Sequence, residues 1–353
     1  MESLEILKKA VENKASDIFI IAGKPFAYKI NNKIVDFGGE IMLPMSCNKI
    51  ISQIYELAEN RDMEKYIADG DDDFAFSVPG LSRFRVSVYR QRSSLAAVIR
   101  VINVELPNPQ DIHIPQSVID LGELKTGLVL ITGSAGSGKS TTLSCIIDKI
   151  NNSRSCHIIT LEDPLEFLHK HKKSIVSQRE VPMDTKSYVA ALRASLRQSP
   201  DVILLGEMRD YETINIAMTA AETGHLVLST LHTVGAANSI DRIVDVFPEN
   251  QQAQVRVQLA MVLKAVVSQQ LIPGTDGKPV PAFEIMLCNN AVHNMIREAK
   301  THQIDTVISS SAQEGMTTMN ASLAKLIQDG KVTLSDGLLF SSNPEMLKKI
   351  LKK

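Results

Sequence analysis

Apolar runs alternate with segments of helical periodicity over the last two thirds of the chain. Four short apolar runs have the length and composition of buried parallel strands. These runs lie at 128–132, 157–161, 202–206 and 226–230. Between the first two, Leu143, Ile146, Ile147 and Ile150 recur at the spacing of one helix face. Strands that alternate with helices are typical of an α/β fold built on a parallel sheet.

The first third of the chain mixes helical and strand patterns. We expect a strand at 15–21, an amphipathic helix at 50–65, and a hairpin that joins 84–89 to 95–102. The acidic run DGDDD at 69–73 lacks the spaced ligands of a calcium loop. We interpret that run as a solvated turn.

A proline-containing stretch of weak periodicity, around Pro107 and Pro109, separates the two patterns. The sequence therefore predicts an α+β domain at 1–103, a linker at 104–113 and an α/β domain at 114–353. The tail of the second domain, from about residue 289, is expected to be helical, with helices near 289–300 and 318–328.

The composition of the chain limits the classes of protein to which it can belong. The 353 residues suit two domains, and a hydrophobic content of 44% provides a sizeable core. A net charge of −2, the absence of tryptophan and 5% aromatic residues argue against a nucleic-acid partner. The 4 cysteines form no C-x-x-C pair, which fits a reducing cytoplasm. No apolar run approaches the ~18 residues of a spanning helix and the start lacks a signal peptide's cations, so we expect membrane association only through partners.

The sequence GSAGSGKS at 133–140 matches the phosphate-binding pattern G-x-x-x-x-G-K-[ST]. It follows a strand pattern and precedes a helical one, which is the context this loop requires. Lys139 is expected to reach the β- and γ-phosphates of a nucleoside triphosphate, and the Ser140 hydroxyl to ligate Mg²⁺. The predicted nucleotide-binding residues are Gly133, Ser134, Ala135, Gly136, Ser137, Gly138, Lys139, Ser140 and Thr141.

A second nucleotide-binding signature follows the apolar run at 202–206, which ends in Glu207. Aspartate is more common than glutamate at this point of the signature. Parallel strands end at one ligand-binding edge of a sheet. We therefore expect Glu207 near Mg²⁺, with a water molecule between them.

The apolar run at 157–161 also ends in acids, which are Glu162, Asp163 and Glu166. One of these carboxylates could orient or deprotonate the attacking water while another supports the metal. We favour Glu166 for the water, with Glu162 as the second choice. Spacing alone does not separate these two residues.

Two histidines, His225 and His232, enclose the strand pattern at 226–230. A zinc site would need a third ligand at suitable spacing, which the sequence does not offer. Two alternatives stay open. Either both histidines are structural, or His225 senses the nucleotide state and His232 bonds phosphate or a neighbouring acid.

Taken together, these motifs make the chain similar to the type IV pilus retraction ATPases of the PilT class, within the type II/IV secretion ATPase superfamily. The resemblance runs through nearly the whole length. It rests on ASD at 15–17, GLSRFRV at 80–86, the phosphate loop, LEDPLEF at 161–167, GEMRD at 206–210, TGHLVLSTLHT at 223–233 and IDRIVDVFP at 240–248.

This resemblance implies a PAS-like α+β domain followed by a RecA-like P-loop ATPase domain with a helical tail. It implies a homohexamer that binds ATP and Mg²⁺ between the two domains of each subunit, with Arg83, Arg85 and Arg100 reaching toward the phosphates. ATP-driven closure of the domains would turn the ring and draw pilin out of the fibre for twitching motility. The direct partner would be the inner-membrane pilus platform protein, which the ATPase would meet at the cytoplasmic face of that membrane.

One stretch departs from the retraction pattern. The family's AIRNLIRE is AVHNMIRE at 291–298, so His293 replaces the first arginine. This replacement leaves an accessory retraction role open.

Three other functions stay open. A pilus assembly or type II secretion ATPase is typically longer and carries a four-cysteine zinc insert, whereas this chain has no paired cysteines; a type IV secretion ATPase of the same superfamily is a further form of this alternative. A nucleic-acid-translocating motor would show a basic channel, and the basic cluster HKHKK at 169–173 is better interpreted as a solvated loop. The last alternative is a nucleotide-binding scaffold without turnover.

Overall fold

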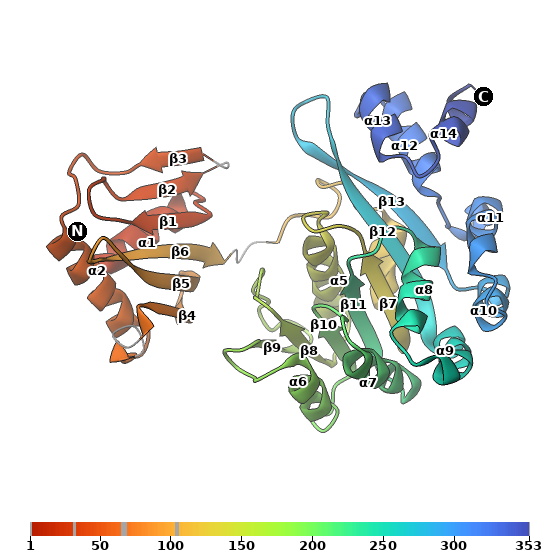
Figure 1. Cartoon of the computed structure of the whole chain (residues 1–353), viewed down its shortest axis with the longest axis horizontal. Helices are drawn as coiled ribbons and strands as arrows, with labels where there is room; N and C mark the ends of the chain where they lie inside the picture. The colour runs from red at the N-terminus through yellow and green to blue at the C-terminus, as the bar shows by residue number, and fades with distance from the viewer. Residues whose placement is uncertain (1, 31–32, 65–68, 103–105, 353) are drawn as a thin grey trace. The chain divides into compact units, whose positions relative to one another are not determined.

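The computed structural model describes residues 2–30, 33–64, 69–102 and 106–352. The chain forms two compact units (Figure 1). One comprises Met1–Glu105 and Leu165–Leu168, and the other comprises Leu106–Pro164 and His169–Lys353. Residues 103–105, where the predicted linker begins, lie outside the described residues.

The described part of the N-terminal unit contains a six-stranded antiparallel sheet in the order β3-β2-β1-β6-β5-β4. Its strands are β1 (Asp17–Ile20), β2 (Ala27–Ile30), β3 (Lys33–Asp36), β4 (Asp71–Val78), β5 (Ser82–Gln91) and β6 (Ser94–Ile102). Its helices are α1 (Ser3–Glu12) and α2 (Pro44–Leu57). In β5, Phe84, Val86 and Val88 are fully buried in the core that both helices cover. The sheet therefore has one apolar face, as the alternation of the predicted hairpin requires.

Two expectations for this unit need correction. Helix α2 spans Pro44–Leu57 rather than 50–65, and it can begin early because a proline fits the first turn of a helix. The acidic run is not a solvated turn, since Asp72 lies in β4 and is only 2% exposed. Its carboxylate pairs with Arg61 at 3.0 Å and accepts a hydrogen bond from the Tyr55 hydroxyl at 3.1 Å. A buried acid with a cation and a hydroxyl as partners is a structural feature.

In the described residues, the second unit contains a seven-stranded sheet in the order β13-β12-β7-β11-β10-β8-β9. The pairs from β12 to β9 are parallel, and β13 is antiparallel to β12. The strands are β7 (Gly127–Thr132), β8 (His157–Glu162), β9 (Ile175–Glu180), β10 (Val202–Leu205), β11 (Leu226–Leu231), β12 (Leu263–Pro273) and β13 (Pro279–Leu287). The four strands expected from the apolar runs are thus confirmed as β7, β8, β10 and β11.

Helices cover both faces of this sheet (Figure 1). One face packs on α4 (Gln116–Ile119), the short helix η1 (Asp120–Glu123) and α5 (Lys139–Ser153). The other face packs on α6 (Tyr188–Ser195), α7 (Tyr211–Glu222), α8 (Ala236–Asp245), α9 (Glu249–Val262), α10 (Asn290–Arg297) and α11 (Ile304–Ser310). In β7, Leu128 and Leu130 face the second layer, whereas Val129 and Ile131 face the first. Every side chain of β7 is therefore buried, as in other parallel sheets.

The tail beyond β13 is helical, as predicted. Two short helices, η2 (Thr301–Gln303) and η3 (Ala312–Glu314), flank α11. The last helices are α12 (Met319–Gln328), α13 (Leu334–Phe340) and α14 (Pro344–Leu351). They pack on Ile272 and Val280, close to the turn of the β12–β13 hairpin (Figure 1). The sequence patterns had not identified this hairpin.

Candidate nucleotide-binding site

The predicted phosphate loop connects β7 to α5, in the strand–loop–helix arrangement that the motif requires. Gly133, Gly136 and Gly138 all have positive φ, at 142°, 76° and 88°. A side chain at Gly133 would bring its Cβ to 2.2 Å from the Gln269 carbonyl oxygen. Only glycine fits there, because the backbone of β12 passes directly beside the loop.

Lys139 is the first residue of α5 and is only 8% exposed. Its ammonium donates hydrogen bonds to the carbonyl oxygens of Gly133 and Ser134, at 2.9 and 2.8 Å. The loop thus folds around its own lysine and holds the cation at the N-terminus of the helix. Positive charge at a helix N-terminus makes a strong site for an anion.

Gln269 of β12 supports the loop and was not identified from the sequence. Its side chain is 3% exposed, and its Oε1 accepts a hydrogen bond from Thr142 Oγ1 at 2.7 Å. Its Nε2 lies 2.8 Å from the position of a Cβ on Gly138. Gln269 therefore fastens both the end of the loop and the first turn of α5 to the sheet.

Glu207 lies two residues beyond the carboxyl end of β10, and its side chain is 17% exposed. Its Oε1 pairs with Arg209 Nε at 2.7 Å, and its Oε2 lies 3.3 Å from His232 Nε2. His232 directly follows β11, the neighbouring strand. The parallel sheet thus brings the predicted metal-side acid and one predicted histidine into contact.

Glu162, the last residue of β8, lies beside Gly206, because Leu161 of β8 is the register partner of Leu205. Glu162 Oε1 accepts hydrogen bonds from Thr160 Oγ1 at 2.6 Å and from Gln178 Nε2 at 3.3 Å. These contacts fix the carboxylate at the same sheet edge that carries the phosphate loop.

Tyr188 at the start of α6 was not identified from the sequence. Its hydroxyl lies 2.8 Å from the position of a Cβ on Gly206. Burial raises the pKa of Tyr188, and the nearby carboxylates of Glu207, Asp163 and Glu162 raise this pKa further. Tyr188 therefore remains a neutral hydrogen-bonding group among three acids.

His225 does not lie at this edge of the sheet. It precedes β11 and so lies at the amino end of the strand, whereas His232 follows the carboxyl end. The six residues of β11, at ~3.3 Å each, separate the two histidines. His225 Nδ1 lies 2.9 Å from the Ala220 carbonyl oxygen and 3.3 Å from Thr223 Oγ1. Its role as a nucleotide sensor stays a prediction, which the geometry of a single chain does not support.

The three arginines predicted to reach the phosphates belong to the sheet of the N-terminal unit. Arg83 and Arg85 alternate with the buried residues of β5, and Arg85 is the register partner of Arg100 on β6. All three arginines therefore lie on the sheet face opposite the core. Arg100 Nε pairs with Asp17 Oδ1 at 3.1 Å. Glu166 is exposed and belongs to Leu165–Leu168, the segment that groups with this unit.

A cavity of about 580 Å³ adjoins the phosphate loop. Gly138, Thr141 and Thr142 form one wall of it. The other walls come from residues 111–114 and from the β12–β13 hairpin, where Asp276 and Lys278 lie. A volume in the range of ~300–1,000 Å³ suits a small organic ligand.

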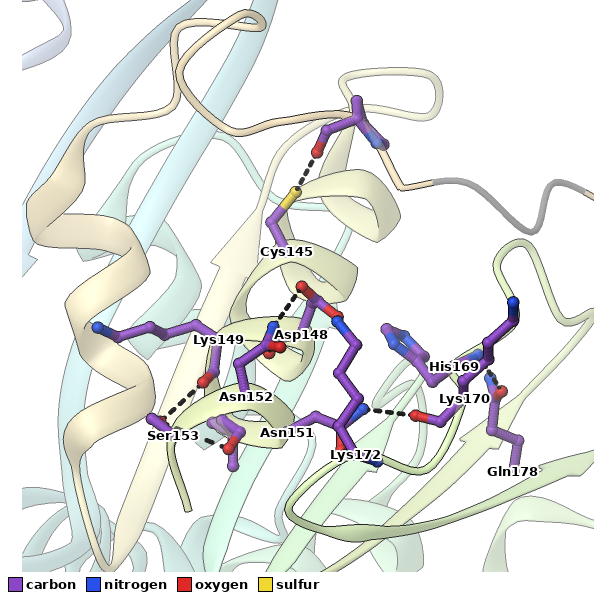
Figure 2. A network of polar contacts seen from close by, with 12 residues as sticks. Cys145, Asp148, Lys149, Asn151, Asn152, Ser153, His169, Lys170, Lys172 and Gln178 are labelled. Atoms are coloured by element: carbon purple, nitrogen blue, oxygen red, sulfur yellow. Dashed lines mark hydrogen bonds and ion pairs between the residues drawn. The ribbon is translucent and has the colours of Figure 1, made fainter.

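The side chains of residues 170–173 in the basic loop are exposed, as the interpretation of a solvated loop requires, and the loop is also fastened to α5 (Figure 2). Asn151, which is fully buried, donates to the Lys170 carbonyl oxygen at 2.7 Å and accepts from Lys172 N at 3.2 Å. Lys172 Nζ pairs with Asp148 Oδ1 at 2.6 Å. At the start of the loop, His169 N donates to Gln178 Oε1 at 2.8 Å, and this glutamine also bonds the candidate acid Glu162. Helix α5 therefore braces the loop that returns from the acidic segment.

The described residues contain no group of three or more metal-ligating side chains that would hold a metal ion by themselves. Two oxygen donors predicted to face Mg²⁺ are the Ser140 hydroxyl in the first turn of α5 and the Glu207 carboxylate beyond β10. Such a pair suits Mg²⁺, which keeps several waters and takes its other ligands from phosphates. Within the described ranges, no helix has the length and apolar character needed to cross a bilayer.

Comparison with known proteins agrees with this site. The family model for the type II/IV secretion system protein matches residues 3–279. The type IV pilus retraction ATPase PilT of Pseudomonas aeruginosa is 39% identical over 98% of this chain and 99% of its own length. The type IV pilus ATPase PilU of the same organism is 36% identical over 100% of this chain and 92% of its own length.

A solved structure extends the agreement to the backbone. The crystal structure of the pilus retraction motor PilT with bound ADP has a TM-score of 0.90, with 44% identity, over 99% of both chains. The similarity therefore includes both units and the phosphate loop. This chain belongs to the type II/IV secretion system protein family and, within it, to the PilT family of pilus retraction ATPases.

Proposed function

We propose that this protein is an ATPase that powers the retraction of type IV pili as a hexameric motor. The observation that carries the proposal is the carboxyl edge of the sheet, where the phosphate loop, Glu162, Glu207 and His232 follow neighbouring parallel strands. Similarity to the P. aeruginosa retraction ATPase over 98% of the chain supports the same conclusion.

The phosphate loop would bind ATP through its backbone N–H groups and through Lys139. The ammonium now contacts two loop carbonyls, and it would give up these contacts for β- and γ-phosphate oxygens. The cavity beside Gly138 and Thr141 would take the base and the ribose. Ser140, together with Glu207 through water, would hold Mg²⁺, which supplies Lewis-acid stabilisation of the phosphates.

Turnover also requires a group that accepts a proton from water. Glu166 remains our first candidate and Glu162 our second, since the Glu162 carboxylate is already fixed by Thr160 and Gln178. His232 would orient Glu207, which an arginine also contacts. Arg83, Arg85 and Arg100 would complete the site by stabilising the charge on the transferred phosphoryl group.

The finer architecture belongs to the same proposal. The N-terminal unit would be PAS-like and the second unit RecA-like, with six copies in a ring. The ring would act on the pilus platform protein at the cytoplasmic face of the inner membrane, and thereby on pilin. Binding and release of nucleotide would close and open the two units of each subunit.

A second candidate function is that of an accessory retraction ATPase, which the sequence at His293 favours. His293 replaces an arginine of the retraction motif, and the pKa of its imidazole is lowered mainly by burial. The side chain is therefore mostly neutral at pH 7, whereas the arginine would carry a permanent charge.

Deletion of the encoding gene in its host tests the proposed function. A retraction motor predicts surplus surface fibres and no twitching, and the Lys139→Ala variant should fail to restore it. An accessory role predicts weakened twitching with an ordinary number of fibres. Cells without fibres would contradict both candidates and indicate an assembly ATPase.

A further inference from the structure

Helix α8 begins directly after the loop that carries His232, and its first N–H groups are held by the β12–β13 hairpin. Gly235 N donates to Ser268 Oγ at 2.9 Å, and Ala236 N donates to Glu284 Oε1 at 2.8 Å. The residue before the helix is Gly235, which has no side chain to cap it. Ser268 and Glu284 therefore perform the capping that the local sequence cannot.

The two capping residues form one unit, because Ser268 and Glu284 are register partners on neighbouring strands. In the same row of the sheet, Ser268 is the partner of Thr132, and Thr132 is the partner of Leu231. Neighbouring strands lie ~4.8 Å apart. The loop from the end of β11 to the start of α8 thus crosses the end of β7, the strand that leads into the phosphate loop.

This short loop, residues 232–235, is fixed at both of its ends. At its start, His232 Nε2 lies 3.3 Å from Glu207 Oε2. Within it, Thr233 Oγ1 and Ser239 Oγ lie 2.7 Å apart, and Ser239 Oγ donates to the Gly235 carbonyl oxygen at 2.7 Å. Few backbone torsions separate the capped helix start from His232, so the cap constrains where His232 lies.

Glu284 is an unusual residue to find in this position. It is only 7% exposed, and burial raises the pKa of its carboxyl. The Asp305 carboxylate raises this pKa further, whereas hydrogen bonds from the backbone of Ala236 and Met319 lower it. Burying a carboxyl is unfavourable unless hydrogen bonds satisfy it. Both backbone bonds go to helix starts, where a negative side chain is favoured.

We propose that Glu284, acting with Ser268, is a positioning residue for ATP turnover that holds His232 against Glu207. The proposal rests on the roles in turnover proposed above for His232 and Glu207. Nucleotide binding uses the opposite face of β12, where Gln269 supports the phosphate loop. Loss of Glu284 should therefore slow turnover and leave ATP binding unchanged.

Steady-state phosphate release by the full-length protein tests this, with Glu284→Leu and Glu284→Gln compared. Leucine removes the acceptor for Ala236 N, so kcat should fall about tenfold while the KM for ATP stays within about twofold. Glutamine keeps an oxygen acceptor, so its kcat should stay within about threefold of wild type. Ser268→Ala is a milder second variant that leaves the buried acid in place, and it should lower kcat about threefold at constant KM.

A double-mutant cycle distinguishes positioning from a general structural effect. If Glu284 acts through His232, kcat of the Glu284→Leu/His232→Ala protein should lie within about twofold of the slower single variant. The same cycle with Ser268→Ala covers the case in which Glu284→Leu does not fold.

Three results would overturn the proposal. The first is an unchanged kcat in both Glu284→Leu and Ser268→Ala. The second is a rise in KM that accounts for the whole loss of kcat/KM, and the third is a double variant whose loss of kcat equals the product of the two single losses. If Glu207→Gln and His232→Ala themselves turn over at the wild-type rate, the proposed site fails and the positioning role fails with it. If those two variants are slow and the Glu284 and Ser268 variants are not, only the positioning role fails.

Discussion

The amino ends and the carboxyl ends of the parallel strands form two opposite edges of the seven-stranded sheet, here called the amino edge and the carboxyl edge. Both edges carry histidines, but in different surroundings. At the amino edge, His157 places its two ring nitrogens 3.0 Å from the Gln198 carbonyl oxygen and 3.0 Å from Ser177 Oγ. His225 at that edge likewise contacts a backbone carbonyl. At the carboxyl edge, His232 contacts only the Glu207 side chain among the described residues, and 49% of its own side chain is exposed.

The different partners of these histidines indicate different roles for the two edges. A histidine bonded to backbone carbonyls is held by the fold and contributes to stability. An exposed histidine paired with an acid can exchange that partner for a ligand without disturbing the fold. Turnover should therefore depend on the carboxyl edge, and stability on the amino edge.

The largest expected effect comes from Lys139, the most buried cation of the carboxyl edge. Lys139→Ala should lower phosphate release about a thousandfold, because the variant loses the ammonium that would stabilise charge on the β- and γ-phosphates. Lys149→Ala is the matched control, since Lys149 lies on the same helix and pairs with Glu123 at 3.3 Å. A Lys139→Ala protein that releases phosphate at the wild-type rate would contradict the conclusion that turnover depends on the carboxyl edge.

The two candidate acids that follow β8 should give the next largest effect. Glu166→Gln should still bind ATP and should hydrolyse it about a hundredfold more slowly, because an amide cannot accept the proton from water. Binding is measured with a fluorescent nucleotide and turnover by phosphate release. Unchanged turnover in Glu166→Gln together with slow turnover in Glu162→Gln would move this role to Glu162.

The two histidines at the ends of β11 test the comparison within one strand. His232→Ala should lower kcat about tenfold with little change in melting temperature, because the residue is exposed. His225→Ala should leave kcat unchanged and reduce the free energy of unfolding by about 1 kcal/mol, because it loses a hydrogen bond to a carbonyl. The reverse outcome would contradict the assignment of the two edges.

The last expected effect concerns pH rather than turnover, and it involves His169, whose buried Nδ1 has no hydrogen-bond partner within the described residues. Burial lowers its pKa from 6.5 to about 4, while Asp148 raises the pKa and Lys172 lowers it. Between these values the unfolded chain binds a proton that the native protein does not, so stability falls as the pH falls. Between pH 7 and pH 4.5 the wild type should lose about 2 kcal/mol more than His169→Gln. Denaturant unfolding at both pH values measures this, and equal losses would show that His169 is not buried as described.

Sequence patterns predicted the carboxyl edge well, because it follows from a simple rule. The phosphate loop, Glu162, Glu207 and His232 each follow an apolar run, and parallel strands end on the same side. The same rule places His225 at the other edge, since it precedes its strand. The functional prediction for His225 therefore has no support from this rule and stays a prediction.

The sequence patterns did not identify the buried polar residues. Gln269 and Glu284 interrupt the apolar pattern of β12 and β13, and a polar residue in a strand ordinarily indicates a solvent-facing position. Helix α9 also runs into β12 without a turn, since Val262 ends one and Leu263 begins the other. Asp72 offered a usable signal, because it shares a period of two with the buried Phe74 and Phe76.

The most direct test of the account is a crystal structure of the protein with Mg²⁺ and a non-hydrolysable ATP analogue. The account predicts phosphates in the loop, with Lys139 turned from the carbonyl oxygens of Gly133 and Ser134 to the β- and γ-phosphates. It also predicts that the Ser140 hydroxyl ligates Mg²⁺ and that Glu207 lies one water away. An analogue bound elsewhere, with Lys139 still on its two carbonyls, would contradict it.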